Sequence, residues 1–308
     1  MADGDVLVIG SLNMDLVAQV NEMPRVGETI VGNHFDMIIG GKGSNQAVAA
    51  ARLGSRVSMI GCVGNDAFGD QMVASLTQEK INVTGIRRGE SASGTALITV
   101  DQHGNNSITV ISGANYELTN EDIDRHINLF QDCDVIVLQL EIPLAVVQYC
   151  ISIGRKFGKQ IILNVAPMQK LPHEIFKDIN FLVLNEIEAE ELLHIPFSQF
   201  EQLEKGLSQL GCEHVIWTLG DKGAVYINQG RSVKFDSYKI KAVDTTGAGD
   251  SFIGALAGQI TRRTDVEDAI RYAVKVSAVT VTKLGAQSSL PTFEEVQNFK
   301  QQWGESGE

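Results

Sequence analysis

The sequence contains a glycine-rich heptapeptide, DTTGAGD at residues 244–250, and SFIGALA follows it at residues 251–257. The second segment is typical of a helix, and the glycines permit a tight turn that exposes backbone N–H groups at the helix N-terminus. The helix dipole favours negative charge at that end, so the turn is suited to bind an anion. Asp250 lies in the predicted first turn, where it would repel an anion but could accept a proton as a general base. For this motif alone, a helix cap is the commoner role of such a carboxylate.

A second glycine-rich turn precedes another predicted helix. The segment IGGKGSNQ covers residues 39–46, and AVAAARLG covers residues 47–54. It does not match the Walker A motif, because Gly43 follows Lys42 where that motif requires Ser or Thr, and it lacks the GxGxxG spacing of dinucleotide-binding turns. Backbone N–H groups and one lysine can still bind an anion or a polyol. A plain left-handed turn is the alternative.

Three shorter motifs follow predicted strands. GSLNMD, residues 10–15, places Asn13 and Asp15 where open α/β sheets bind ligands, and such a pair can bind vicinal hydroxyl groups. An Asx turn is the alternative. NEIE, residues 185–188, offers acids for a hydrated Mg²⁺, or simply acids favoured at a helix N-terminus. TLGDKG, residues 218–223, is a glycine-rich turn between two strands.

Short apolar runs alternate with helical patterns along most of the chain. Most of the runs lack polar alternation, as expected for strands covered on both faces. The strand candidates are Val6–Ile9, Val57–Ile60, Val135–Leu138, Ile161–Asn164, Phe181–Leu184, Val215–Thr218 and Ala224–Ile227. Helix signals lie between them: Pro143 in a first turn, a capping box at residues 119–122, and an apolar stripe over residues 200–210. The alternation predicts an α/β fold with a mainly parallel, doubly wound sheet flanked by helices.

Two stretches break this alternation. Residues 11–40 show little helical periodicity, while Gly94–Val100 and Ser107–Ile111 have the composition of a β-hairpin. We expect these separated segments to form a small β-sheet lid over a cleft, although two unrelated insertions are the alternative. The predicted large domain comprises residues 1–10, 41–91 and 113–303. The predicted lid comprises residues 11–40 and 92–112, and residues 304–308 are expected to form a flexible tail.

Composition narrows the classes of partner. The chain has 308 residues, with 38 acidic against 25 basic side chains and a formal charge of −13. A dispersed negative field repels phosphate backbones, so nucleic acid is not an expected partner. No apolar run reaches the roughly 18 residues of a membrane span, and the first residues lack the features of a signal peptide. A membrane is therefore not an expected partner either.

Cysteine and histidine usage indicates the compartment. The four cysteines form no CxxC pair, which favours free, buried thiols in a reducing compartment; they are Cys62, Cys133, Cys150 and Cys212. The six histidines show no ligand spacing, so a His/Cys metal site is not expected. We expect a cytoplasmic protein, present also in the nucleus if the organism is eukaryotic.

In this order and spacing, the motifs resemble those of the ribokinase-like carbohydrate kinase family, which includes ribokinase, fructokinase and adenosine kinase. The resemblance runs from about residue 5 to residue 295. GGKGSNQAVAA at residues 40–50 is similar to the family's N-terminal signature, and DTTGAGD at residues 244–250 to its C-terminal one. NMD at residues 13–15, LE at 140–141 and TKLGAQSS at 282–289 add to the likeness.

The resemblance implies a fold and a reaction. The fold is one large α/β domain with a β lid. The reaction is ATP-dependent phosphorylation of a sugar's primary hydroxyl, here O5 of D-ribose, to give D-ribose 5-phosphate and ADP. Mg²⁺ and an activating K⁺ are the implied ions, and a homodimer formed through the lid is the implied assembly.

The resemblance also assigns roles to individual residues. Asp250 matches the catalytic base, and the matching anion hole is Gly247, Ala248 and Gly249. The sugar set, together with Asp250, comprises Asn13, Asp15, Gly41, Lys42, Asn45 and Glu141. The nucleotide set, which also orients Mg²⁺, comprises Asn185, Glu188, Thr218, Gly220, Gly223 and Gly249. The cation set around K⁺ comprises Asp244, Thr246, Thr280, Lys283, Gly285 and Ser289.

Three alternatives stay open. A related kinase could act on deoxyribose, a hexose or a nucleoside, although a nucleoside needs an apolar wall and aromatic residues are only 6% of the chain. A non-catalytic sugar or nucleotide sensor could use the same scaffold, but it could dispense with Asp250. The range of phosphoryl donors is also open, because Val274 lies where some relatives place His or Asn near adenine.

Overall fold

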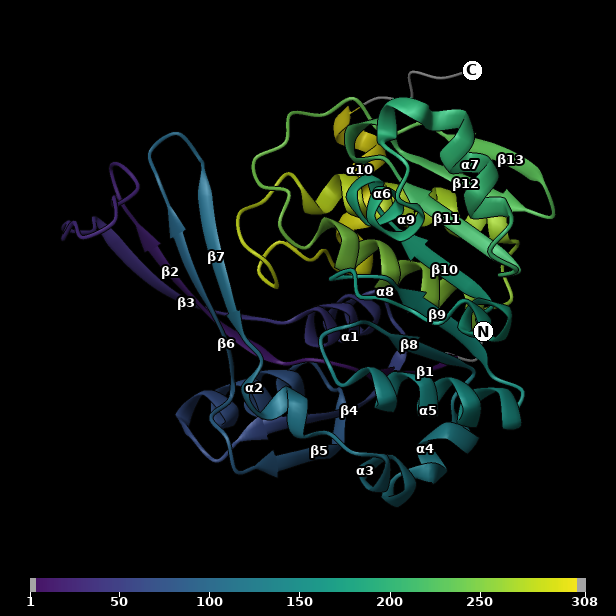
Figure 1. Cartoon of the computed structure of the whole chain (residues 1–308), viewed down its shortest axis with the longest axis horizontal. Coiled ribbons are helices and arrows are strands. Elements are labelled where there is room, and N and C mark those ends of the chain that lie inside the picture. The colour runs from purple at the N-terminus through teal and green to yellow at the C-terminus, as the bar shows by residue number, and fades with distance from the viewer. Residues whose placement is uncertain (1–3, 304–308) are drawn as a thin grey trace.

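The main body of the molecule is a nine-stranded sheet, which a computed structural model describes within residues 4–303, the last four by their backbone alone (Figure 1). All neighbouring strands are parallel except at one edge, where β12 is antiparallel to both β11 and β13. In spatial order the strands are β13 (Arg231–Phe235), β12 (Ala224–Asn228), β11 (His214–Thr218), β10 (Phe181–Leu184), β9 (Gln160–Asn164), β8 (Val135–Leu138), β1 (Asp5–Ile9), β4 (Arg56–Gly64) and β5 (Asn82–Gly89). The predicted mainly parallel sheet is confirmed.

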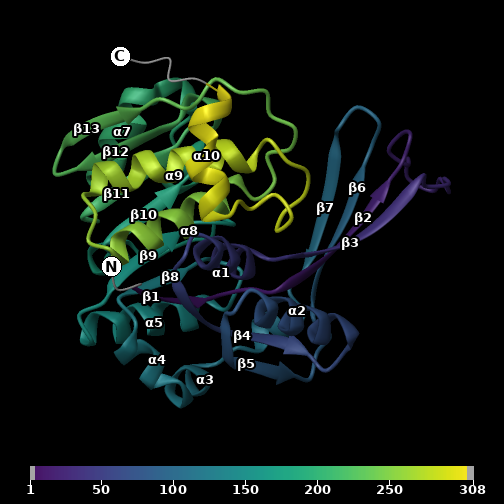
Figure 2. The ribbon, with the colours of Figure 1, turned by 180° about the vertical axis from the view of Figure 1, so that it is seen from behind.

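Helices cover both faces of this sheet (Figures 1 and 2). One apolar core lies beneath α1 (Lys42–Arg52), α2 (Ala67–Gln78), α8 (Ala248–Thr261), α9 (Val266–Thr280) and α10 (Phe293–Trp303). The other lies beneath α3 (Asn120–Arg125), α4 (Ile127–Asp132), α5 (Leu144–Lys156), α6 (Glu186–Leu193) and α7 (Phe200–Ser208). Within β1, Val6 and Val8 face the first core while Leu7 and Ile9 face the second. This is why the strand sequences are apolar throughout.

A second sheet of four strands projects from the main one in both views (Figures 1 and 2). Its spatial order is β3 (His34–Gly40), β2 (Asn13–Gln19), β6 (Gly94–Val100) and β7 (Asn106–Ile111). The two antiparallel pairs come from separated parts of the chain and join through parallel pairing of β2 with β6. The prediction of one small sheet built from two segments is confirmed. The predicted tail, residues 304–308, lies outside the described residues.

Several local predictions need correction. The capping box of Thr119 with Asp122 is present, but His126 divides the expected helix into α3 and α4. Pro143 is the N-cap of α5 instead of part of its first turn. The strands β5 and β13 were not predicted, because their charged and glycine residues hide an apolar run. Short 3-10 segments are η1 (Gly113–Glu117), η2 (His173–Asp178), η3 (Phe197–Gln199) and η4 (Gly220–Lys222).

The prediction that the cysteines are free and buried is confirmed at three of the four positions. Cys62, Cys133 and Cys150 are free and buried, whereas Cys212 is only half-buried. Burial raises the pKa of the Cys62 thiol to about 11 and that of Cys133 to about 12.

Within the described chain, none of the helices combines the length and apolar character needed to cross a membrane.

Helices α1 and α8 approach each other closely because Gly254 has no side chain. A Cβ atom at this position would lie 2.5 Å from the Cβ of Ala49 and 2.7 Å from the backbone N of Ala50. These contacts are with a short side chain and a backbone atom, neither of which can move aside. The contact sets how far the N-terminal turns of the two helices lie from each other.

We expect Gly254→Ala to destabilise the protein, because the overpacking cost of about 1–3 kcal/mol exceeds the gain of about 1 kcal/mol in helix propensity. Urea unfolding measures the difference. Gly206→Ala in α7 is the matched control, since a Cβ there meets only the end of the flexible Leu193 side chain. Wild-type stability of Gly254→Ala would show that the two helices are not held at this contact.

Candidate active site

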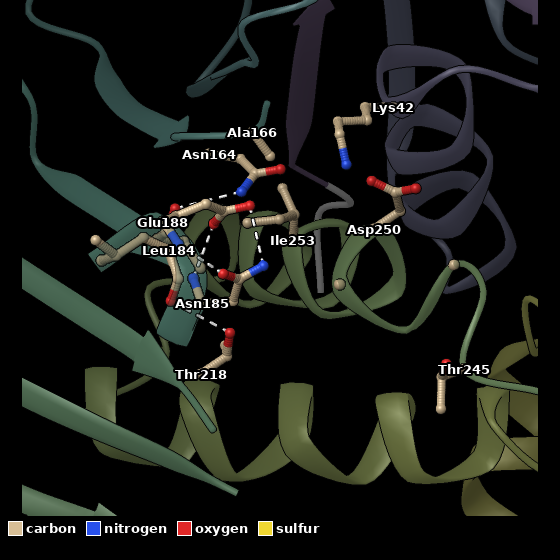
Figure 3. A pocket seen from close by; sticks show the side chains of 13 residues that line it. Lys42, Asn164, Ala166, Leu184, Asn185, Glu188, Thr218, Thr245, Asp250 and Ile253 are labelled. Carbon is tan, nitrogen blue, oxygen red and sulfur yellow. Dashed lines mark hydrogen bonds between the residues drawn. The ribbon is translucent and has the colours of Figure 1, made fainter. Parts of the chain in front are cut away.

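Polar side chains follow four neighbouring parallel strands at their carboxyl ends. Gln139 comes directly after β8, Asn164 ends β9, Asn185 follows β10 and Thr218 ends β11. The N-terminus of α8 lies opposite this row, and a cavity of about 240 Å³ separates the two (Figure 3). The cavity is lined by Lys42, Asn164, Ala166, Val183, Leu184, Asn185, Glu188, Thr218, Thr245, Gly247, Gly249, Asp250 and Ile253. Ligands of open α/β sheets bind at this edge.

Helix α8 begins without a side-chain cap. Gly247 is its N-cap, with a φ of 78° that favours glycine. The N–H of Ala248 donates to the carbonyl of Thr245 at 3.2 Å, so of the three predicted anion-hole residues this one has its amide engaged. Gly249 has open space where a side chain would be, and it lines the cavity. The helix end is thus arranged to accept an anion from the cavity.

Asp250 does not cap its own helix. Its carboxylate instead accepts hydrogen bonds from α1, at 2.9 Å from Nδ2 of Asn45 and at 3.0 Å from Nε2 of Gln46. The helix-cap alternative is therefore wrong for this residue. Burial raises the pKa of Asp250, while Lys42 and these two hydrogen bonds oppose the rise. A buried carboxylate with a raised pKa at the edge of a cavity has the character of a general base.

Lys42 is the cation that faces this carboxylate. Its ammonium group and the carboxylate of Asp250 point toward one another in Figure 3. Burial lowers the pKa of Lys42, but the carboxylates of Asp250, Glu141 and Glu188 together raise it above its ordinary value. Gly41 precedes Lys42 with a φ of 92°, and a Cβ atom there would lie 2.7 Å from the backbone N of Asn13. The second glycine-rich turn therefore joins α1 tightly to β2.

The predicted sugar set comes together around this turn. Asn13 is buried and accepts a hydrogen bond from Nδ2 of Asn115 at 2.8 Å. Burial, with Glu141 and Asp250 nearby, raises the pKa of Asp15 to about 7. Glu141 accepts from the backbone N of Lys42 at 3.1 Å and from the hydroxyl of Ser11. Carboxylate and amide groups from three separate segments thus converge near Asp250.

The predicted nucleotide set is only partly gathered at the cavity. Asn185 and Glu188 form a capping box at the start of α6, with Glu188 N donating to Asn185 Oδ1 at 2.9 Å. They line the cavity with Thr218, whose hydroxyl donates to the carbonyl of Leu184 at 3.2 Å. Gly220 and Gly223 lie outside the cavity lining, in the turn between β11 and β12.

The cation set lies where two segments meet behind the N-terminus of α8. Oδ2 of Asp244 accepts from the N–H of Gly285 at 2.8 Å, and Oδ1 accepts from the N–H of Thr246 at 2.9 Å. The Thr280 hydroxyl instead donates to the carbonyl of Val276 within its own helix, and Lys283 pairs with Glu295. The Ser289 hydroxyl donates to the carbonyl of Ala286 at 2.7 Å. A hard cation here would depend on Asp244 and backbone carbonyls, which are suitable oxygen ligands.

Acidic groups outnumber basic ones in the site. Asp15, Glu141 and Asp250 influence one another, and Glu188 faces Lys42. Burial raises the pKa of Glu188 as well. In the described chain, His, Cys, Asp and Glu side chains do not gather in threes closely enough to enclose a metal ion. A hydrated Mg²⁺ needs only one or two carboxylates, so Glu188 and the surplus of acids fit such an ion.

Sequence reasoning missed several residues of the site, namely Ser11, Gln46, Asn115, Gln139 and Asn164. Gln139 and Asn164 carried a usable signal, because each stands at the carboxyl end of a predicted buried strand. Asn115 carried none, since only the folded chain brings it to Asn13.

The raised pKa of Asp15 predicts a pH-dependent stability. Its carboxyl has a pKa of about 7 when folded against 3.8 ordinarily. The unfolded chain therefore ionises first as pH rises, and stability falls between about pH 4 and pH 7. We expect Asp15→Asn to remove part of this fall and to unfold at higher urea concentration than the wild type at pH 8, with little difference at pH 4.

The control is Asp36→Asn on the neighbouring strand β3, where the carboxylate is 40% exposed. Urea titrations at several pH values measure all three proteins. An equal fall in stability for wild type and Asp15→Asn would contradict burial of this charge.

The comparisons with known proteins agree with this geometry. Residues 3–293 match the model of the pfkB family of carbohydrate kinases. A deoxyribokinase of Salmonella typhi is 39% identical over 300 residues, covering 96% of this chain and 98% of the relative. A ribokinase of Schizosaccharomyces pombe is 39% identical over 306 residues, covering 95% of this chain and 96% of the relative. The structure of a ribokinase of Arabidopsis thaliana, complexed with ribose and ATP, superposes with a TM-score of 0.88 at 29% identity. The match covers 97% of this chain and 98% of that ribokinase.

The family model, the relatives and the fold agree with the two glycine-rich turns and the buried carboxylate of the site. This chain belongs to the pfkB family of carbohydrate kinases.

Proposed function

We propose that the protein transfers the γ-phosphoryl group of ATP to O5 of D-ribose, giving D-ribose 5-phosphate and ADP. The observation that carries the proposal is Asp250, a buried carboxylate at the uncapped N-terminus of α8, in a cavity shared with Lys42 and Glu188. Phosphoryl transfer requires positioning and charge stabilisation more than covalent catalysis. The Arabidopsis ribokinase complexed with ribose and ATP supports the choice of both substrates.

Asp250 acts as the general base. Its raised pKa makes the carboxylate a better proton acceptor than an exposed aspartate, and the amides of Asn45 and Gln46 hold its ionised form. It takes the proton of the sugar O5 as that oxygen attacks phosphorus. The expected benefit of such a base is about 10²–10⁴ in rate.

Negative charge develops on the transferred phosphoryl group. The backbone N–H groups of Gly247 and Gly249 at the start of α8 stabilise it, with Ala248 completing the turn. Lys42, kept charged by the surrounding carboxylates, adds a positive group on the sugar side. Mg²⁺, when bound near Asn185 and Glu188, neutralises the charge of the ATP phosphates.

The sugar and the nucleotide bind on opposite sides of Asp250. Hydrogen bonds to the hydroxyl groups come from the sugar set: Asn13, Asp15, Gly41, Lys42, Asn45 and Glu141. The phosphates lie toward Asn185, Glu188 and Thr218, and the turn at Gly220 and Gly223 contributes to the nucleotide side. Val274, only 6% exposed, belongs to the apolar core of α9 and leaves the donor preference to other residues.

We further propose that K⁺ binds between the segments joined by the Asp244–Gly285 hydrogen bond. Asp244 and backbone carbonyls of the cation set would be its ligands, because the side chains of Thr280 and Lys283 are engaged elsewhere. Such an ion would hold the segment that leads into Gly247.

The four-stranded sheet serves as a lid, with the boundaries 11–40 and 92–112. It also mediates a homodimer. Large apolar side chains on it are about half exposed, which is unusual for a surface that stays in water; they are Phe35, Met37, Leu97, Ile108, Val110 and Ile111. Free thiols at Cys133 and Cys150 favour the reducing cytoplasm as the compartment.

Deoxyribose is a second candidate substrate. The Salmonella deoxyribokinase is as similar to this chain as the fission yeast ribokinase is, at 39% identity for each. A purely sensory role is disfavoured, because a sensor has no use for a buried base beside an anion-binding turn.

Asp250→Asn tests the base directly. The neutral amide cannot take the proton, so we expect kcat to fall by about 10²–10⁴ while the fold and sugar binding remain. Coupled assays of ADP release, with and without ribose, measure turnover, and thermal unfolding checks the fold. Turnover close to that of the wild type would remove Asp250 from the mechanism.

Sugar preference is tested by comparing kcat/KM for ribose, deoxyribose, fructose and adenosine. A site that binds a hydroxyl group through buried polar side chains rejects an analogue lacking it, so we expect deoxyribose to be poorer than ribose by about 10²-fold or more. Equal or better use of deoxyribose would reassign the substrate while leaving the kinase chemistry intact.

A further inference from the structure

We propose that Gln46 is a positioning residue, oriented by Gln139, that holds the carboxylate of Asp250 ionised and aligned for proton transfer. The inference rests on the proposed role of Asp250 as general base. It concerns two side chains that the cavity lining does not include and that therefore act through another residue. Gln46 is 1% exposed and Gln139 is fully buried.

The hydrogen bonds fix the direction in which the Gln46 amide points. Its Nε2 donates to Oδ1 of Asp250 at 3.0 Å and to Oδ1 of Asn164 at 3.2 Å. Its Oε1 accepts from Nε2 of Gln139 at 2.6 Å. A primary amide has two N–H donors on one side and an acceptor on the other, and all of them are engaged here. If the Gln46 amide were reversed, its Oε1 would face the oxygens of Asp250 and Asn164, and its Nε2 would face Nε2 of Gln139.

Gln139 supports this direction, because its Nε2 donates to the oxygen of the Gln46 amide. It follows β8 directly and lies against Gly10, where a Cβ atom would come within 1.9 Å of Gln139 Oε1. That Oε1 is buried and has no hydrogen-bond partner among the described residues. An unpartnered buried oxygen lowers stability, and an apolar side chain would avoid the loss. Among the described residues, the bond from Gln139 to Gln46 is the one hydrogen bond that this side chain makes.

Together with Asn45, Gln46 holds both oxygens of the carboxylate. The two donors come from consecutive positions of α1, one to Oδ2 and one to Oδ1. Two fixed bonds set the plane of the carboxylate, so its remaining lone pairs face the cavity in one orientation. Asn45 belongs to the proposed sugar set, whereas Gln46 has no proposed role in sugar binding, so its proposed role is to orient the carboxylate of Asp250.

The charged groups around Asp250 define the expected sign of a pH effect. Lys42 faces it from α1 itself, Glu141 follows β8, Asp15 lies on β2 and Glu188 on α6. Burial raises the pKa of Asp250, and the donor on Gln46 opposes the rise. Removing this donor raises the pKa further, so the base loses its ionised form at a higher pH.

The test compares Gln46→Met and Gln139→Met, which keep side-chain volume, through the pH profile of kcat/KM. We expect the acid limb of Gln46→Met to move up by roughly one pH unit, as for loss of one hydrogen bond to a charged group. Gln139→Met should move it less, because Gln46 keeps its donor but loses its orientation. Above the limb, Gln46→Met should stay below the wild-type rate, because only Asn45 then orients the carboxylate.

A residue that only packs the core would lower the melting temperature and the rate at every pH, with the limb unmoved. Asn180→Leu is the matched control, because Asn180 is a buried amide that directly precedes β10, at the amino ends of the strands, and donates to Glu213. It should lower stability without moving the limb. An unmoved limb in Gln46→Met would overturn the inference.

The two proposals fail in different ways. Asp250→Asn with wild-type turnover would remove the base and the positioning role together. Loss of turnover in Asp250→Asn, combined with a wild-type pH profile in Gln46→Met, would leave the base in place and remove only the role of Gln46.

Discussion

The site depends on keeping one carboxylate, Asp250, away from water and yet able to ionise. Burial opposes the charge, and the helix start beside it is arranged to accept another anion. The compensation comes from a different helix, because Asn45 and Gln46 of α1 donate to the two oxygens. This arrangement needs α1 and α8 in near-backbone contact, which Gly254 permits. The close packing of α1 against α8 and the hydrogen bonds to Asp250 therefore depend on the same contact.

The charge balance of the site works against the stability of the folded protein. Burial raises the pKa of Asp15, Glu188 and Asp250, and one lysine, Lys42, faces them. Such a surplus of acid is unfavourable until hydroxyl groups, a cation or a proton relieves it. Under the proposed function, binding of a polyol and of a metal-bound nucleotide would do so, which links substrate affinity to the burial of these charges. Pre-arranged polar groups of this kind lower the reorganisation needed during the reaction.

The fold was largely predictable because its signals are local. Strands buried on both faces have continuous apolar runs, and the glycine turns before α1 and α8 are read directly from residues 40–43 and 247–249. The strands β5 and β13 were not predictable in this way, since charged and glycine residues interrupt their apolar pattern. The break at His126, which separates α3 from α4, was not predicted either. Pairing of β2 with β6 was predicted only as one small sheet, without its register.

The site was predictable where a motif carries the chemistry, and not where the support comes from elsewhere. Asp250 could be named from its heptapeptide, but its role as base or helix cap could not be decided there. A cap would bond to N–H groups of its own helix, and only the folded chain shows the carboxylate turned to α1 instead. The same holds for Gln139, whose amide matters only because Gln46 stands beside it. A short motif identifies the proposed reacting group, whereas the side chains that hydrogen-bond to it come from the three-dimensional packing around it.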